Sequence, residues 1–342
     1  MKIRYPRPLQ PGDLIGVTSP SSGVPEELVP RLNFAVDRLR DAGFEVQVGQ
    51  CMDGSSHASA PAEQRAKELM RMLLDPKVRA IVPPWGGEMA IDLIEHLDFN
   101  ALAEAEPTWI VGFSDISTLL TPLTLRTGLA TIHGNNLMDT PYRVPESLKS
   151  WIELASLPEG SVFRQSSPGY FRANDWDDWE TNPQVTEHQY NGSGSWRRLD
   201  GRTQNVDVTG RLIGGCIETL SNLTGTGNLD TRALRDSPAQ SLIVYVEASG
   251  VEATTICRQL YGLRMAGFFE GAAAVLIGRT NAPDSPTLTQ DEAVLDALGQ
   301  LGIPMIGDVD CGHVPPQMPI INGALGHLVC NGAEQYLDQY LA

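Results

Sequence analysis

Three residues of this chain have side-chain types that together could carry out nucleophilic catalysis. The first is Ser114, which lies in Gly112-Phe-Ser-Asp115, between a short apolar run and a segment with apolar residues at helical spacing. A serine on such a strand-to-helix turn stands at a helix N-terminus, where backbone N–H groups stabilise negative charge. An ordinary helix N-cap would also account for a serine here. The turn by itself therefore leaves both interpretations open.

A serine becomes a nucleophile when a base accepts its proton and a carboxylate orients that base. Among the six histidines, His313 is the candidate base because it lies in a stiff turn, Asp310-Cys-Gly-His-Val-Pro-Pro316. Glu247 is the candidate carboxylate because it ends an apolar strand predicted over 241–246. Without a catalytic role, His313 would be an ordinary surface or core histidine, and Glu247 would be a strand-end residue that reaches water. The order Ser, Glu, His also occurs in α/β-hydrolases, but Gly112-Phe-Ser-Asp-Ile116 lacks the second glycine of their G-x-S-x-G turn.

Strands and helices alternate around the candidate serine. The pattern predicts strands over 13–20, 44–48, 78–82, 109–111 and 129–133, and helices over 25–42, 60–74, 88–97 and 116–126. Such alternation predicts a parallel sheet with helices on both faces, in which ligands bind beyond the carboxyl ends of the strands. Gly86-Gly87 and Ser114 both follow strand ends, so we expect them to share one rim.

The pattern changes after about residue 156. Residues 161–201 are polar but carry six large aromatic residues: Tyr170, Phe171, Trp176, Trp179, Tyr190 and Trp196. They predict either a small satellite core or an aromatic wall for a flat ligand such as a nucleobase, and the composition favours neither. A second α/β unit follows, with strands over 206–213, 241–246 and 272–277 and helices over 252–266 and 290–301.

The expected organisation is therefore two α/β domains joined by a substrate loop. Residues 1–155 would form the nucleophile domain, 156–205 the aromatic-rich connecting loop, and 206–342 a domain with its own sheet that carries Glu247 and His313. A chain of 342 residues is long enough for two cores. The active site would then lie in the cleft between the domains.

Composition limits the possible partners and the compartment. The net charge of −17 disfavours nucleic-acid polymers and anionic membranes, although a small anionic ligand could still bind in a local pocket. The five cysteines include no C-x-x-C pair, which argues against a disulfide framework or a zinc site and is typical of a reduced, cytoplasmic protein. We also expect no signal peptide and no membrane-spanning segment.

Taken together, the motifs resemble the serine-type LD-carboxypeptidase family and, within it, the microcin C self-immunity peptidases. The resemblance spans about residues 10–330 and rests on the order and spacing of five motifs: Gly86-Gly87, Gly112-Phe-Ser-Asp115, Gly210-Arg-Leu-Ile-Gly-Gly215, the strand ending in Glu247, and Gly312-His-Val-Pro-Pro316. It implies a flavodoxin-like N-terminal domain, a C-terminal α/β domain, an interdomain active site, a homodimer, and no metal or cofactor.

The resemblance also implies individual roles. Ser114 would be the nucleophile, His313 the general base and Glu247 its orienting carboxylate. The oxyanion hole would be the backbone N–H groups of Gly87 and Asp115. The candidate substrate-binding residues are Trp85, Gly86, Trp176, Trp179, Trp196 and Cys216, with Arg197 or Arg198 near a phosphate. Cys216 departs from the asparagine common in immunity-type members, which leaves substrate contacts at that position open.

Two features favour the immunity-type members over those that cleave muropeptides. Pro84-Trp-Gly-Gly-Glu88 stands where muropeptide-cleaving members have Arg-Gly-Gly-Tyr-Gly, and the aromatic segment resembles the loop that stacks an adenine. The expected reaction is hydrolysis of the amide bond of an aminoacyl-nucleotide conjugate, which would detoxify it. The alternatives are a murein tetrapeptide LD-carboxypeptidase of cell-wall recycling and a non-catalytic adenylate-binding protein.

Overall fold

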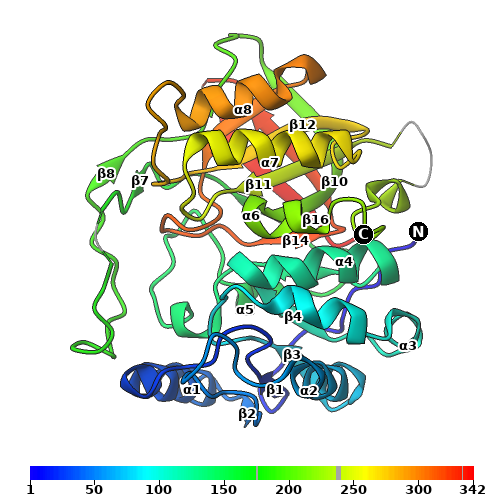
Figure 1. The fold of residues 1–342 in the computed structure, drawn as a ribbon, viewed down its shortest axis with the longest axis vertical. Coiled ribbons are helices and arrows are strands. Elements are labelled where there is room, and N and C mark those ends of the chain that lie inside the picture. The colour runs from blue at the N-terminus through cyan, green and yellow to red at the C-terminus, as the bar shows by residue number, and fades with distance from the viewer. Residues whose placement is uncertain (175, 236–239, 333) are drawn as a thin grey trace.

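The computed structural model describes residues 1–174, 176–235, 240–332 and 334–342, which form two α/β domains, each built on its own sheet (Figure 1). This confirms the fold class expected from the sequence. Within those ranges, no helix has the length and hydrophobicity that crossing a bilayer would require.

The first sheet is parallel except for one strand from the end of the chain. Its order is β14-β5-β4-β3-β1-β2, with bounds Ile320–Asn322, Thr131–His133, Trp109–Gly112, Val78–Ile81, Leu14–Val17 and Glu45–Val48. β14 pairs antiparallel with β5, so a strand that follows the His313 turn closes the edge of the nucleophile domain. The chain therefore crosses between the domains a second time, which ties the His313 turn to both sheets.

Helices cover both faces of this sheet, as in a doubly wound fold. They are α1 (Val29–Asp41), α2 (Ala62–Leu74), α3 (Phe99–Glu104), α4 (Ser117–Thr127) and α5 (Trp151–Ala155). Successive residues of β4 point to opposite faces of the sheet. Trp109 and Val111 pack with α1 and α5 on one face, and Ile110 packs with α2, α3 and α4 on the other. The helix predicted over 88–97 is instead a 3-10 helix, Ala90–His96. Hydrogen bonds from the backbone N–H groups of Met89 and Ala90 to side chains fix its start.

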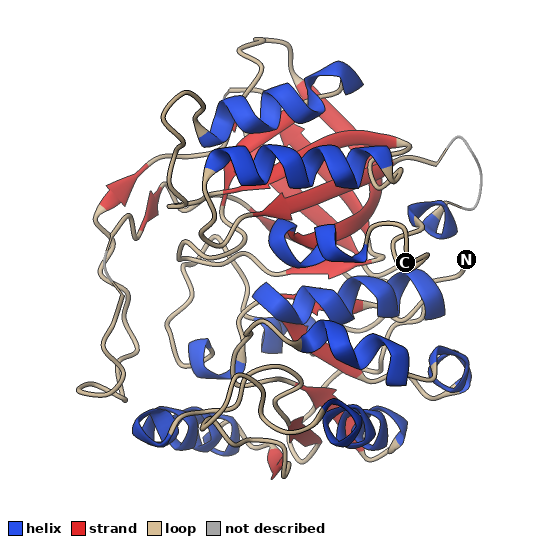
Figure 2. Ribbon diagram, in the orientation of Figure 1, coloured by secondary structure: helices blue, strands red, loops and turns tan. Residues whose placement is uncertain are grey.

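The second sheet is mixed and has the order β6-β16-β15-β10-β11-β12-β13-β9. The bounds, in the same order, are Val162–Gln165, Gln335–Tyr340, Leu325–Cys330, Val206–Cys216, Leu242–Glu247, Ala272–Gly278, Met305–Val309 and Arg197–Arg198. The helices of this half are α6 (Ile217–Leu220), α7 (Ala253–Met265) and α8 (Gln290–Leu298). α7 and α8 lie side by side against one face of the sheet (Figure 2). β11 is buried along its whole length between two parallel neighbours, which is why its sequence is almost entirely apolar.

The structure also contains short 3-10 turns, at Glu26–Leu28, Ser114–Ile116, Leu137–Asp139, Ser221–Leu223, Thr231–Leu234 and Gly299–Leu301. Strands β14, β15 and β16, and helices α3 and α5, were not anticipated from the sequence. Each is six residues or shorter, and segments of this length carry too little periodicity to be recognised.

Residues 169–174 and 176–194, here called the arm, extend from the second domain along the first (Figure 1). The base of the arm is a two-stranded ribbon, β7 (Tyr170–Phe171) with β8 (Gly192–Ser193). Arg31 of α1 holds the far part. Its fully buried guanidinium donates to the carbonyl oxygens of Pro183 (3.0 Å) and Val185 (2.6 Å), and also to that of Met138 (2.9 Å). Arg31 thus helps to fasten the arm to the nucleophile domain, together with hydrogen bonds that Tyr142 and Arg143 make with the arm.

Replacing this arginine should loosen the arm. We expect Arg31→Met to lower the free energy of unfolding by about 2–4 kcal/mol, because buried carbonyl oxygens lose their charged donor. Cleavage within the arm by a nonspecific protease should also become faster. Arg38→Met, on the exposed side of the same helix, is the control and should change stability by less than about 0.5 kcal/mol. Unchanged protection of the arm in Arg31→Met would contradict the anchoring role.

Candidate active site

Ser114 occupies a strained turn between β4 and α4. Its backbone φ is +62°, a left-handed conformation that non-glycine residues seldom adopt and that costs on the order of 1 kcal/mol or more. The turn continues as the 3-10 helix Ser114–Ile116 and then as α4, so the hydroxyl stands at a helix N-terminus. The left-handed backbone of this residue agrees with the sequence-based expectation of a serine on a sharp strand-to-helix turn.

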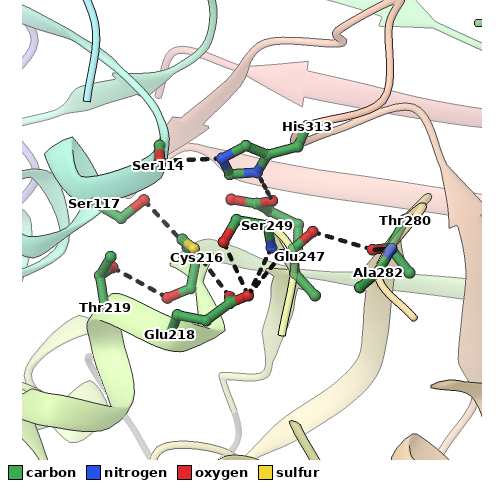
Figure 3. A network of polar contacts seen from close by, with 12 residues as sticks. Ser114, Ser117, Cys216, Glu218, Thr219, Glu247, Ser249, Thr280, Ala282 and His313 are labelled. Carbon is green, nitrogen blue, oxygen red and sulfur yellow. Dashed lines mark hydrogen bonds and ion pairs between the residues drawn. The ribbon is translucent and has the colours of Figure 1, made fainter. Parts of the chain in front are cut away.

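Three side chains from the two domains meet in one hydrogen-bonded chain (Figure 3). The Nδ1 atom of His313 lies 2.7 Å from Oε2 of Glu247, and its Nε2 atom lies 3.0 Å from Oγ of Ser114. An ionised Glu247 can only accept, so Nδ1–H donates to it and Nε2 is left to accept the serine hydroxyl. The structure therefore brings together Ser114, His313 and Glu247, which are far apart in the sequence.

His313 and Glu247 shift each other's pKa in opposite directions. Burial lowers the pKa of His313, but the charge of Glu247 and its hydrogen bond raise it by more, so that the pKa of His313 lies above the usual 6.5. Burial raises the pKa of Glu247, but the charge and hydrogen bond of His313 outweigh it and hold that pKa below the usual value. The nearby His133 is different: burial lowers its pKa to about 4, and neither ring nitrogen has a hydrogen-bond partner in the described part of the chain.

Two glycines make room for the glutamate. A Cβ at Gly312, whose φ is +114°, would lie 2.5 Å from Oε2 of Glu247, and a Cβ at Gly278 would lie 2.5 Å from the Cβ of Glu247. Any side chain at either position would displace the carboxylate. Gly312, directly before His313, is thus required both by its backbone conformation and by the contact it makes.

The carboxylate of Asp115 joins the serine turn to the glycine turn that follows β3. Oδ2 accepts hydrogen bonds from Ser21 Oγ (2.5 Å) and from the backbone N–H of Ala90 (2.8 Å). Gly86 lies so close to the serine that an added Cβ would be 2.9 Å from Ser114 Cβ and 3.1 Å from the backbone nitrogen of Asp115. The backbones of the two turns, which carry the N–H groups of Gly87 and Asp115, are therefore held together beside the hydroxyl.

A second polar network adjoins the first and is drawn below it in Figure 3. Cys216 pairs with Glu247 in the register of β10 and β11, and its backbone N–H donates to Ser117 Oγ (3.1 Å). Its thiol donates to Oε2 of Glu218 (3.2 Å), and Oε1 of Glu218 accepts from the backbone N–H and the hydroxyl of Ser249. Cys216 is fully buried, so the structure gives this residue a packing role and no access to a ligand.

A cavity of about 240 Å³ opens beside His313. It is enclosed by the arm, the nucleophile turn, the segment after β5 and the His313 turn. Its lining residues are Phe113, Asn135, Asp139, Tyr142, Arg172, Trp176, Asp177, Trp179, His188, Gly312, His313, Pro315 and Gln317. Trp176 and Trp179, which the sequence nominated as substrate-binding residues, are part of this lining. Ligand clefts usually enclose roughly 300–1,000 Å³, so this one would hold part of a ligand, with the remainder reaching toward Ser114.

The remaining tryptophan candidates lie elsewhere, which corrects the sequence-based interpretation. Trp196 is fully buried and donates through Nε1 to Oδ2 of Asp310 (2.9 Å), so it supports the His313 turn from the core and cannot stack on a ligand. Trp85 donates to the carbonyl oxygens of Ser22 and Gly23 and does not line the cavity.

The two arginines expected near a phosphate are also engaged elsewhere. Arg197 bonds Asp291 (2.6 Å) and Asp308 (2.5 Å), and Arg198 bonds Asp200. Both belong to β9, at the edge of the second sheet, and neither lines the cavity.

Sequence reasoning missed several cavity residues. Tyr142 stacks on His188 with ring centroids 3.7 Å apart, and Asp139 precedes it in the same segment after β5. Their place after a predicted strand on the rim of a parallel sheet was the available signal. Gln317 follows the His313 turn and carried no comparable signal. Among the described residues, no group of three or more His, Cys, Asp or Glu side chains is arranged to hold a metal ion.

The chain matches both domain patterns of one enzyme family. The LD-carboxypeptidase N-terminal domain matches residues 15–134, and the LD-carboxypeptidase C-terminal domain matches residues 209–328. A Vibrio cholerae protein that carries a carboxypeptidase name is 28% identical over 334 residues, which are 94% of this chain and 94% of that protein.

Two further relatives are named for different activities. The microcin C7 self-immunity protein MccF of Escherichia coli is 24% identical over 331 residues, covering 92% of this chain and 89% of that protein. A probable murein peptide carboxypeptidase of Bacillus subtilis is 24% identical over 331 residues, covering 93% and 89%. The solved structure of MccF with aspartyl sulfamoyl adenosine has a TM-score of 0.82 to this chain at 21% identity, over 98% of both. At that identity the likeness establishes a shared fold.

The hydrogen-bonded chain predicts how His313 titrates. In the wild-type protein its pKa, followed by NMR of the ring protons, should lie above 6.5, whereas His133 should stay neutral down to about pH 4. Glu247→Gln removes the charge that raises the pKa of His313 but leaves the burial that lowers it, so the midpoint should fall below 6.5. Asp207→Asn, beside the distant His327, is the control and should leave it in place. An unchanged midpoint in Glu247→Gln would refute the coupling.

Proposed function

Because this chain belongs to the LD-carboxypeptidase family, both of whose domains it carries, we propose that it is a serine peptidase with Ser114 as nucleophile. His313 acts as the general base and Glu247 orients its imidazole. The observation that carries this proposal is the unbroken chain of hydrogen bonds from Glu247 through His313 to Ser114. The strained backbone of Ser114 supports it, because strain of this kind persists where a residue must be held in position.

The geometry supports a two-step acyl transfer. Ser114 Oγ attacks the amide carbonyl carbon while Nε2 of His313 takes its proton, and the resulting imidazolium is stabilised by ionised Glu247. The tetrahedral oxyanion is bound by the backbone N–H groups of Gly87 and Asp115, each worth about 3–4 kcal/mol in comparable enzymes. His313 then passes the proton to the leaving nitrogen, and a water molecule hydrolyses the acyl-enzyme with His313 again acting as base.

The proposed substrate is an aminoacyl-nucleotide conjugate in which an amide joins the amino acid to a sulfamate or phosphoramidate. The aromatic cavity supports this choice because its lining includes His313, whose Nε2 atom would protonate the leaving group. Trp176 and Trp179 offer flat faces on which a nucleobase can stack. The fold is shared with MccF, whose structures include complexes with aspartyl sulfamoyl adenosine and glutamyl sulfamoyl guanosine. Hydrolysis would separate the amino acid from the nucleotide and so detoxify the conjugate.

A murein tetrapeptide is the second candidate substrate, because relatives in Bacillus subtilis and Pseudomonas aeruginosa carry murein carboxypeptidase names. Its leaving group, D-alanine, bears a free carboxylate that calls for a cationic partner. The arginine in the cavity lining, Arg172, is already paired with Asp177 at 2.5 Å. The cavity therefore suits a nucleoside better than a terminal carboxylate.

A paired turnover assay tests both the mechanism and the substrate. Purified protein is incubated with aspartyl or glutamyl sulfamoyl adenosine and, separately, with the murein tetrapeptide. We expect cleavage of the nucleotide conjugate, and Ser114→Ala should lower turnover by roughly 10⁴-fold or more while the circular dichroism spectrum is unchanged. Labelling of Ser114 by a fluorophosphonate distinguishes an enzyme from a non-catalytic binder.

The outcomes are distinct. Retained turnover in Ser114→Ala would overturn the assignment of the nucleophile. Cleavage of the tetrapeptide alone would assign the protein to cell-wall recycling. Failure to cleave either substrate, together with no labelling of Ser114, would favour the non-catalytic binder over the enzyme.

A further inference from the structure

Two fully buried polar groups at the junction of the domains have no hydrogen-bond partner among the described residues. One is Oε1 of Glu247, and the other is the imidazole of His133, the last residue of β5, both of whose nitrogens are unpartnered. Most buried polar groups in native proteins are hydrogen-bonded, so each exception needs an explanation. The proposed mechanism assigns no part to His133.

Aromatic contacts place the ring of His133 close to Glu247. The ring centroid lies 5.1 Å from that of Tyr245, which precedes Glu247 by two residues on β11. Side chains two residues apart on a strand leave the same face, so Glu247 points to the side on which His133 packs. The ring of Phe113 contacts both imidazoles edge-on, with its centroid 6.4 Å from that of His133 and 5.0 Å from that of His313. His133 therefore lies on the same side of β11 as the carboxylate.

No hydrogen bond joins His133 directly to Glu247, although each lies within range of the other's charge. An ionised carboxylate oxygen can only accept, and a neutral imidazole offers one donor and one acceptor. A single water molecule can accept from the ring N–H and donate to Oε1, which satisfies both groups. Buried waters in globular proteins occupy such positions and make about three hydrogen bonds each with polar groups that lack other partners.

We propose that an internal water molecule binds between His133 and Oε1 of Glu247, and that His133 acts through it as a positioning residue for the Glu247–His313 pair. The inference deepens the proposed function and rests on it for the role of Glu247. A hydrogen bond on Oε1 would oppose rotation of the carboxylate, so that Oε2 stays directed at Nδ1 of His313. It would also replace part of the hydration that burial removes from the carboxylate.

This role requires His133 to be neutral. Burial lowers its pKa to about 4, and of the charged groups near it Glu247 raises that pKa while His313 lowers it further. The hydroxyl of the neighbouring Tyr245 is already bonded to Asn322 (2.8 Å). The imidazole of His133 is therefore uncharged at neutral pH. A neutral donor stabilises the carboxylate without cancelling its charge, which stays available to raise the pKa of His313.

The titration of His313 in the full-length protein tests the role of His133. His133→Phe keeps an aromatic ring against Tyr245 and Phe113 but removes both nitrogens. Because a less well solvated carboxylate favours protonation of the pair, the midpoint of His313, followed by NMR of its ring protons, should rise by about 0.5–1 pH unit. The acidic limb of the kcat profile should move upward by the same amount while KM changes little. His133→Gln, whose amide can still donate to water, should restore most of the wild-type midpoint.

Thr127→Val is the matched control, because it removes a buried hydroxyl that both donates and accepts a hydrogen bond in the same domain. It should lower the melting temperature and leave the midpoint of His313 in place. An unchanged midpoint in His133→Phe, an equal shift in Thr127→Val, or no restoration in His133→Gln would overturn the inference.

A high-resolution crystal structure of the wild-type protein tests the water site without any substitution. The expected result is a water molecule about 3 Å from both Oε1 of Glu247 and a ring nitrogen of His133. A direct bond between the two side chains, or no water between them, would overturn the inference. The NMR titration and the crystal structure need no substrate. If both give the expected result but the wild-type protein cleaves neither candidate substrate, the proposed function fails and the water site stands.

Discussion

The buried carboxylate of Glu247 is the interaction on which the rest of the site depends. Its side chain is fully inaccessible to solvent, and an ion removed from water in this way costs several kcal/mol unless it is paired. Its partner is His313, which bonds one oxygen, while the second oxygen has no partner among the described residues. The carboxylate therefore stays ionised only while the imidazole faces it. The same pairing makes the imidazole a stronger base toward Ser114, so stability and the proposed reactivity share one contact.

The fold requires this contact to form between distant parts of the chain. β11 is the most enclosed strand of its sheet, and Glu247 stands at its carboxyl end, next to the end of β12. The imidazole comes from the turn after β13, one strand further along the sheet. Neighbouring parallel strands end on the same edge, so two residues 66 positions apart become adjacent without a long side chain. The serine comes from the other sheet, whose strands end at the same cleft.

The sequence predicted those parts of the site that follow from regular strands. Ser114, Glu247 and His313 each lie just beyond an apolar run, and the alternation of strands and helices predicted both sheets. Trp196 was misplaced because an aromatic residue in a polar segment gives no sign of which side faces the core. Its indole N–H found Asp310, a buried acceptor in another segment. Gln317 was missed because its place in the cavity lining depends on how distant segments pack after folding, and no sequence pattern records that.

Because Ser114 lies in one domain and its proposed base in the other, the two domains must be held in a fixed relative position. A displacement of about 1 Å between a nucleophile and its base can cost roughly 100-fold in rate. Helix α4 follows the 3-10 turn that begins at Ser114. It bonds β10 through Thr121 to the carbonyl of Gly214 (2.6 Å) and through Ser117 to the backbone N–H of Cys216 (3.1 Å). A Cβ on Gly215 would lie 2.8 Å from the Cβ of Ser117, so the glycine allows the helix to approach the strand closely. Because β10 pairs with β11 in register up to Glu247, these contacts set the position of the serine relative to the carboxylate. The Gly210-Arg-Leu-Ile-Gly-Gly215 motif thus serves the active site by fixing the distance between its two halves.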